Sequence, residues 1–185
     1  LSVYARNRWV RKYLRHVKKN AFPPFPKKLM LMVTSRCNLN CLFCEVPQRR
    51  YRKKELSKEE VFFIIEKAYQ LGVEEIEFTG GEPLMYKYLW EAIEYALSKG
   101  LKVDITTNGL LIKENIEFIK KVPFNGISVS IDGREKTHNY LRGKDCYAEI
   151  LENIELLQKY GKDVAVNFVV NAQNVDELEN VYNYF

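Results

Sequence analysis

The sequence lacks any long uninterrupted apolar segment. A membrane-spanning helix needs about 20 consecutive apolar residues, and no run in the chain approaches that length. The N-terminus is also unlike a signal peptide, because Arg and Lys interrupt its apolar residues throughout. A cytoplasmic protein is therefore expected. Of the 185 residues, 46% are hydrophobic and 29% are charged, a composition sufficient for one folded core and unlike that of a disordered chain.

The chain has only a small excess of one charge. The net charge is +5, and most of it lies in residues 6–19 and 49–54. This is less than a dedicated nucleic-acid binder usually carries, so no nucleic-acid partner is expected. Residues 1–20 predict a basic amphipathic helix, which either packs on the domain with a solvated basic face or makes peripheral membrane contact. With the Pro-rich linker that follows, it forms segment 1–26, and a single core domain is expected over 27–185.

From residue 29 onward, strand-like and helix-like segments alternate. Strands are expected over 29–34, 75–79, 102–106, 126–131 and 164–170. Helices are expected over 58–71, 86–99, 113–120 and 147–160, with a last one capped by residues 174–177. Five βα units in succession predict an α/β fold with a parallel sheet, either a partial (β/α) barrel or an open sheet. A closed parallel barrel needs more strands, so the chain is expected to be part of something longer.

The unusual segments of the sequence each follow a predicted strand. They are the cysteine-rich run 35–44, Gly80-Gly81-Glu82-Pro83, Thr107-Asn108-Gly109 and Ser130-Ile131-Asp132-Gly133. The carboxyl ends of parallel strands share one face, where ligands and catalytic groups collect. The sequence therefore predicts a functional site on that face.

Cysteine is scarce but clustered. The chain has four cysteines, and Cys37, Cys41 and Cys44 lie in one short loop, which favours metal binding over disulfides. Three thiolates match a closed zinc site poorly, because such a site wants four ligands. On a [4Fe–4S] cluster they leave one iron open for a ligand. Zinc with a histidine as fourth ligand stays an alternative, although the chain has only two histidines. Cys146 is expected to be a small buried residue.

The other segments have weaker individual signals. Gly80 and Gly81 permit a close backbone approach to a ligand, so a branched side chain at Gly81 is expected to weaken ligand binding without changing the metal content. Glu82 either holds that loop or adds negative charge. Asn108-Gly109 is a common turn dipeptide.

After the fourth predicted strand, Ser130 and Asp132 suit either ribose hydroxyls or local backbone groups. Arg142 suits a carboxylate. His138 is interpreted as a loop residue that orders its neighbours, not as a proton carrier.

Taken together, these motifs resemble the radical S-adenosylmethionine (SAM) superfamily over about residues 29–185. The pattern is most similar to the branch of molybdenum-cofactor synthase and SPASM-type peptide maturases. The resemblance implies a [4Fe–4S] cluster on Cys37, Cys41 and Cys44, with SAM chelating the open iron. The residues that it implies for SAM binding are Phe43, Gly80, Gly81, Glu82, Thr107, Asn108, Ser130, Asp132 and Arg142, with Asn167 as a weaker candidate.

The resemblance also implies the chemistry. A reduced donor of the flavodoxin or ferredoxin type supplies one electron, SAM is cleaved, and a 5′-deoxyadenosyl radical abstracts hydrogen from a small molecule or peptide. No protein side chain is expected to act as the catalyst itself. The basic run 48–54 is either a docking surface for the donor or a solvated loop. The alternatives are a non-catalytic iron–sulfur or SAM-binding module and a zinc-binding interaction domain.

Overall fold

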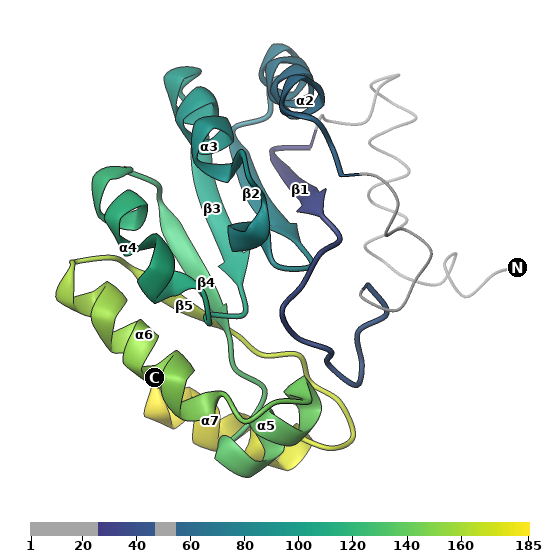
Figure 1. The fold of residues 1–185 in the computed structure, drawn as a ribbon, viewed down its shortest axis with the longest axis vertical. Helices are drawn as coiled ribbons and strands as arrows, with labels where there is room; N and C mark the ends of the chain where they lie inside the picture. The colour runs from purple at the N-terminus through teal and green to yellow at the C-terminus, as the bar shows by residue number, and fades with distance from the viewer. Residues whose placement is uncertain (1–25, 47–54) are drawn as a thin grey trace, which may run out of the picture.

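The computed structural model describes residues 26–46 and 55–185 (Figure 1). Two expectations fall outside these ranges: the basic amphipathic helix over 1–20 and the basic run 48–54. The described residues form one parallel five-stranded sheet with helices packed against it, which confirms the α/β fold class.

The strands follow one another in the sheet in chain order. They are β1 (Lys28–Thr34), β2 (Glu75–Gly80), β3 (Lys102–Thr107), β4 (Gly126–Ser130) and β5 (Val164–Asn167). Every neighbouring pair is parallel. Side chains alternate between the two faces of a strand. In β2 and β3 the apolar residues are buried on the face that the helices cover, and the polar residues between them are only partly buried or exposed. Phe78, for example, is fully buried and lies in register with Leu31 and Ile105.

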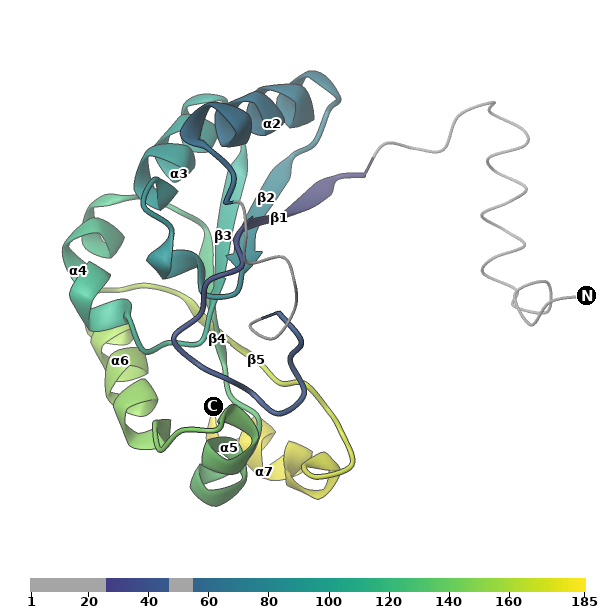
Figure 2. The ribbon, with the colours of Figure 1, turned by 45° about the vertical axis from the view of Figure 1, so that its right-hand side comes forward.

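The helices that connect the strands cover one face of the sheet, and the opposite face carries the cysteine loop (Figure 2). They are α2 (Lys58–Gln70), α3 (Leu89–Ser98), α4 (Ile112–Lys121) and α6 (Tyr147–Lys159). A capping box opens α2: Ser57 Oγ accepts the Glu60 N–H, and the Glu60 side chain accepts the Ser57 N–H. This curved sheet with outer helices is the arrangement of a partial (β/α) barrel.

Two predicted elements are shorter than expected by three residues or more. The second helix was placed over 86–99, but the chain first makes a 3₁₀ turn, η3 (Pro83–Met85), and α3 begins only at Leu89. The fifth strand was placed over 164–170, but β5 ends at Asn167. Beyond Asn167 the backbone bonds to a side chain in place of a strand. The Val169 N–H donates to Asp132 Oδ1 at 3.0 Å, which draws the chain towards the loop after β4.

One helix was not expected at all. Residues Glu135–Arg142 form α5, which ends at Gly143 in a left-handed conformation with φ of 67°. Its sequence is short and mostly polar, so it lacks the apolar periodicity that predicts helices. The glycine at its end was the available signal. His138 therefore lies on a helix, fully buried, and its interpretation as a loop residue was wrong.

The C-terminal segment holds α5 in place. It contains a 3₁₀ turn, η4 (Val175–Glu177), and helix α7 (Leu178–Tyr184). The Glu177 carboxylate accepts the Arg134 N–H and the Thr137 hydroxyl, both at 2.6 Å, at the start of α5. Asn174 was expected to cap the last helix, but its buried side chain donates instead to the carbonyls of Asp132 and Val169.

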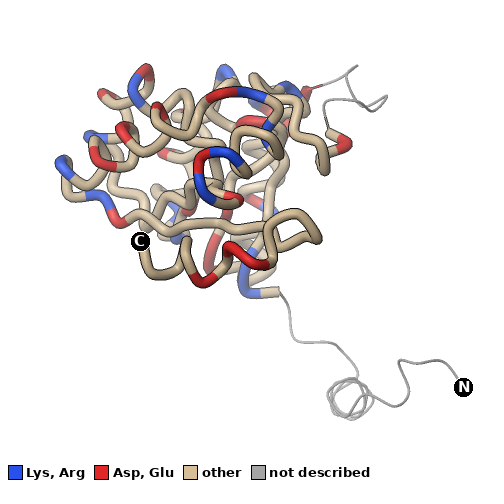
Figure 3. The backbone as a smooth tube through the Cα atoms, turned by 90° about the horizontal axis from the view of Figure 1, so that it is seen from below, with Lys and Arg blue, Asp and Glu red and all other residues tan. Residues whose placement is uncertain are grey.

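Charged residues of both signs are interspersed over the described part of the chain (Figure 3). The helices within that part are too short or too polar to cross a membrane.

Candidate functional site

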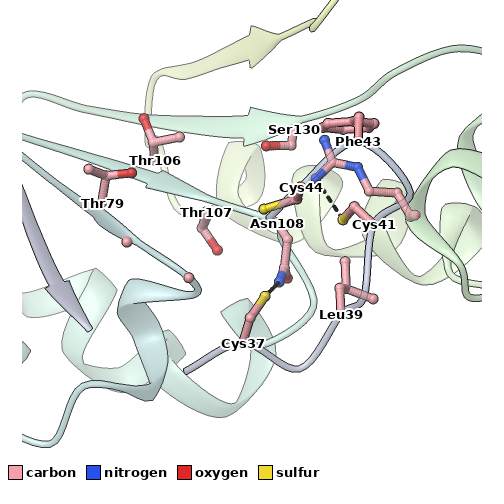
Figure 4. A pocket seen from close by; sticks show the side chains of 13 residues that line it. Cys37, Leu39, Cys41, Phe43, Cys44, Thr79, Thr106, Thr107, Asn108 and Ser130 are labelled. Carbon is pink, nitrogen blue, oxygen red and sulfur yellow. Dashed lines mark hydrogen bonds between the residues drawn. The ribbon is translucent and has the colours of Figure 1, made fainter. Parts of the chain in front are cut away.

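A pocket of about 150 Å³ opens at the carboxyl edge of the sheet, where the motifs were expected to meet (Figure 4). The ends of β2, β3 and β4 border it, together with the cysteine loop and α5. The lining residues are Cys37, Leu39, Cys41, Phe43, Cys44, Thr79, Gly80, Gly81, Thr106, Thr107, Asn108, Ser130 and Arg142.

The cysteine loop has no regular secondary structure and is held by contacts from distant elements. Its Leu42 N–H donates to the Leu141 carbonyl in α5 at 2.9 Å. Gly143 lies against it so closely that a Cβ there would stand 3.0 Å from the Asn40 carbonyl oxygen. Leu39 is buried in the core. The position of the thiols therefore depends on α5, the helix that the sequence analysis did not anticipate.

The three clustered thiols face the same pocket (Figure 4). Cys41 is buried, whereas Cys37 and Cys44 are half-buried. Asn108 Nδ2 lies 3.8 Å from Cys37 Sγ, and Arg142 Nη1 lies 3.7 Å from Cys41 Sγ. Burial raises the pKa of the Cys41 thiol, and the Arg142 guanidinium acts against that rise. Cys146 is buried away from the pocket lining.

The donor set fits a cluster better than a single ion. Within residues 26–46 and 55–185, no three His, Cys, Asp or Glu side chains converge closely enough to hold one metal ion. A [4Fe–4S] cluster makes a different demand, because each thiolate binds its own iron and the sulfur atoms stay apart. Three thiols spaced around a pocket meet that demand. The zinc alternative finds no support in this part of the chain, because His138 does not line the pocket.

The glycine turn after β2 lies directly against the end of β1. The Gly81 N–H donates to the Thr34 carbonyl at 2.8 Å, and the Glu82 N–H donates to the Arg36 carbonyl at 2.7 Å. A Cβ on Gly81 would stand 2.2 Å from the Arg36 oxygen, and one on Gly80 would stand 2.3 Å from the Thr34 oxygen. Both glycines are thus required by this close approach. A larger side chain at Gly81 would displace Arg36, which precedes Cys37, so we now expect metal content to fall together with ligand binding.

Glu82 lies beside the pocket, outside its lining, and its hydrogen bonds join the turn after β2 to the turn after β3. Its side chain is fully buried. Oε1 accepts the Leu84 N–H at 3.1 Å and the Thr107 hydroxyl at 2.7 Å, while Oε2 accepts the Asn108 N–H at 2.8 Å. Burial raises the pKa of this carboxyl, and these hydrogen bonds oppose the rise. Of the two sequence interpretations of Glu82, these contacts match the one in which it holds the loop.

Asn108 connects the turn after β3 to the cysteine loop. Its Nδ2 donates to Asn38 Oδ1 at 2.7 Å, and its Oδ1 accepts the Leu110 N–H at 3.1 Å. The next residue, Gly109, has φ of 89°, a conformation that favours glycine. Its carbonyl accepts from the buried side chain of Asn153 in α6 at 2.9 Å. Asn153 was not identified from the sequence, because nothing local distinguishes it from other polar helix residues.

Ser130 and Asp132 follow β4 but have different surroundings. Ser130 lines the pocket, whereas Asp132 is fully buried and does not. The Asp132 carboxylate pairs with Arg142, with 2.5 Å between Oδ2 and Nη2. The guanidinium also lies over Phe43, 5.5 Å from its ring centre. Asp132 therefore contacts the pocket through Arg142.

The buried side chain of His138 is hydrogen-bonded to the backbone of Asp132. Its Nδ1 accepts the Asp132 N–H at 3.1 Å. Burial, assisted by the positive charge of Arg142, lowers the pKa of His138 to about 3, so the imidazole stays neutral. It orders its neighbours, as the sequence suggested. Asn167, the weaker SAM candidate, is exposed on β5 and does not line the pocket.

Thr79 and Thr106 line the pocket although neither was chosen as a site residue. Each is among the last residues of its strand, on the face turned away from the helices. The alternation of apolar and polar residues along β2 and β3 is the sequence signal that places them on this face.

Fold and site together define a parallel α/β core with a three-thiolate metal site at the carboxyl edge of its sheet. The chain belongs to the radical SAM superfamily, whose family profile matches residues 31–185. Members of this family use a [4Fe–4S] cluster and SAM, and the three-thiol donor set described above fits the cluster.

Relatives come from several branches of the family. The chain is 35% identical over 153 residues to Fe-coproporphyrin III synthase of Methanosarcina barkeri, a match that covers 81% of the chain and 38% of the relative. It is 32% identical over 168 residues to the sporulation killing factor maturation protein SkfB of Bacillus subtilis, a match that covers 90% of this chain and 41% of SkfB. GTP 3′,8-cyclase of Clostridium botulinum is 33% identical to the chain, and the match covers 84% of the chain and 51% of the cyclase.

Solved structures show the same fold. SuiB of Streptococcus suis, bound to its precursor peptide SuiA, superposes with a TM-score of 0.78 at 23% identity, covering 95% of this chain and 40% of SuiB. The present chain thus spans from about two fifths to one half of the length of these proteins.

Proposed function

We propose that this chain is the core of an enzyme that binds a [4Fe–4S] cluster on Cys37, Cys41 and Cys44 and cleaves SAM reductively. The observation that carries the proposal is the meeting of three thiols with the glycine turn at one pocket on the carboxyl edge of the sheet. When bound, the cluster and SAM would supply one-electron reductive cleavage of the sulfonium and hydrogen abstraction from the substrate, with the electron coming from a reduced donor. No side chain of the chain takes part in that bond cleavage.

The protein groups at the pocket would bind and orient SAM. We assign the methionine ammonium to the backbone of Gly80 and Gly81, in the turn that Glu82 holds from below. The methionine carboxylate and the ribose are assigned to Ser130 and Arg142, both in the lining. A guanidinium presents several N–H donors in a fork that matches a carboxylate, which supports this assignment.

The remaining lining residues would shape the pocket around SAM. Phe43, which is 39% exposed at the rim, is assigned to the adenine. Thr107 and Asn108 would lie beside the bound cofactor, and Asp132 would act through Arg142. Excluding water around these groups protects a reactive radical from side reactions.

A small molecule or a peptide is proposed as the substrate. SkfB is described as a maturation protein and SuiB as bound to a precursor peptide, whereas GTP 3′,8-cyclase is named for a nucleotide. The electron would come from a donor of the flavodoxin or ferredoxin type. The surfaces proposed for that donor and for membrane contact lie outside the described residues.

Anaerobic reconstitution with iron and sulfide tests the function directly. The expected result is one [4Fe–4S] cluster per chain and, with SAM and dithionite, release of 5′-deoxyadenosine. Cluster and SAM binding without 5′-deoxyadenosine would favour the non-catalytic module. Zinc binding with no iron–sulfur chromophore would favour the interaction domain and overturn the proposal.

A further inference from the structure

A buried guanidinium lies directly beside one of the three pocket thiols. Arg142 is only 7% exposed, and its Nη1 is 3.7 Å from Cys41 Sγ, a contact that is dashed in Figure 4. The ring of Phe43 covers the guanidinium at 5.5 Å. Salt screens such an enclosed charge poorly, and at Cys41 its effect outweighs the smaller opposite effect of its partner Asp132.

The guanidinium is held in this position by residues that do not touch the pocket. Asp132 pairs with Nη2 at 2.5 Å. The backbone N–H of Asp132 is bonded to His138, and its Oδ1 accepts the Val169 N–H. The start of α5 is fixed separately by Glu177. Arg142 is therefore placed before any ligand arrives.

The contact with Cys41 differs in kind from the one with Cys37. Cys37 receives the neutral amide of Asn108 at 3.8 Å. Cys41 receives a cationic N–H donor, and charge-assisted hydrogen bonds are roughly twice as strong as neutral ones. The protein thus applies a positive charge to one identified thiol of the set.

We propose that Arg142 is a positioning residue that raises the reduction potential of the cluster through Cys41. This inference rests on the proposed function, because it requires a cluster on that thiol. Reduction adds an electron to an anionic centre, and both a nearby positive charge and an N–H donor to a ligating sulfur favour the reduced form. Asp132 serves this role indirectly by orienting the guanidinium. This electronic role is separate from any contact that Arg142 makes with SAM, and it operates before SAM binds.

The first test is a redox titration of the reconstituted full chain without SAM, followed by electron paramagnetic resonance of the reduced cluster. At the midpoint potential of the wild type, the ratio of reduced to oxidised cluster should be at least tenfold lower in Arg142→Gln than in the wild type. For a one-electron couple this corresponds to a midpoint potential lowered by about 59 mV. Arg142→Lys keeps the charge and should show less than half of that shift. Arg134→Gln, an exposed site at the other end of α5, should show none.

An unchanged potential in Arg142→Gln would overturn the inference, and so would an equal shift in Arg142→Lys or Arg134→Gln. These outcomes leave the proposed function intact as long as the wild type assembles a reducible cluster. Failure of the wild type to assemble one would instead refute the proposed function itself.

A second measurement uses the wild type alone, in case Arg142→Gln assembles no cluster. The chain is labelled with ¹⁵N only in arginine, reconstituted and reduced without SAM. Pulsed electron paramagnetic resonance should then detect a ¹⁵N coupling to the cluster that is weaker or lost in Arg142→Lys; any coupling that remains comes from other arginines, such as Arg36 next to Cys37. Absence of the coupling in the labelled wild type, or a coupling of equal strength in the variant, would overturn the inference.

Discussion

Carboxylates lie at both ends of the parallel sheet, and their surroundings at the two ends are opposite. At the amino end, Glu75, Glu77 and Asp104 surround Lys28 at 2.5, 2.9 and 3.2 Å. Their side chains remain 14–28% exposed, and the hydrogen bond that Lys28 donates to Glu75 is the main cause that raises the pKa of Lys28. At the carboxyl end, Glu82 and Asp132 are fully buried.

Burial decides what the same chemical group does at each end. Water screens the amino-end pairs, so each is expected to contribute less than about 1 kcal/mol. A buried carboxylate is different, because removing it leaves its partners desolvated and unpaired. The carboxyl-end groups should therefore be costly to change, and they hold the pocket. The following experiments test that contrast, from the largest expected effect to the smallest.

The largest effect is expected at the thiols that the carboxyl end supports. Replacing Cys37, Cys41 or Cys44 by Ala should remove most of the iron and all SAM cleavage, because each thiolate is assigned to one iron. Cys146→Ala should keep both, since its thiol does not line the pocket. Iron analysis and 5′-deoxyadenosine release measure the outcome. Full iron content in Cys41→Ala, or its loss in Cys146→Ala, would be incompatible with the assignment.

Asp132→Asn should destabilise the fold most among the carboxylate changes. Arg142 would stay buried without its anionic partner, and breaking such a pair costs about 3–5 kcal/mol. The matched change at the amino end, Asp104→Asn, should cost less than about 1 kcal/mol. Urea unfolding of both variants gives the comparison. Equal losses at the two positions would show that burial does not separate the two ends.

Glu82→Gln is expected to have an intermediate effect. The amide has one acceptor oxygen for the three donors that now bind the carboxylate, so at least one buried donor loses its partner at a cost of about 1–3 kcal/mol. SAM affinity should fall as well, because Asn108 is held by one of these bonds. Urea unfolding and equilibrium SAM binding measure the two effects, with Glu75→Gln as the partly exposed control at the amino end. A SAM affinity equal to that of the wild type would mean that Glu82 is structural only.

The smallest expected effect concerns how the stability of the fold depends on pH. The pKa of His138 is lowered to about 3 in the folded chain, below its ordinary value of about 6.5. The unfolded chain therefore takes up this proton first, and stability is lost as pH falls below about 6.5. At pH 5.5 the loss is about 1 kcal/mol.

His138→Asn tests this because it removes the titration while its amide oxygen can still accept the Asp132 N–H. Between pH 7.5 and 5.5, urea unfolding should show a smaller loss of stability in the variant than in the wild type. Equal losses would mean that His138 titrates normally in the folded chain.

Much of the architecture was readable from local pattern. The starts of β2 to β5 and the approximate extents of α2, α4 and α6 depend on neighbours in the sequence, so periodicity and turn chemistry predicted them. The placement of three cysteines in one loop is equally local. The family resemblance followed from these motifs and their order.

The partners of the buried polar groups could only be decided by the tertiary structure. Arg142 and Cys41 lie 101 positions apart in the chain, and Thr107 and Glu82 lie 25 apart, yet each pair is in contact. Helix α5, which forms the first contact, has no apolar periodicity and is stabilised by packing and by the distant Glu177. Sequence pattern records local preference. Burial, which makes Asp132 a partner of Arg142 while Asp104 stays partly exposed beside Lys28, arises only when distant segments pack together and exclude water.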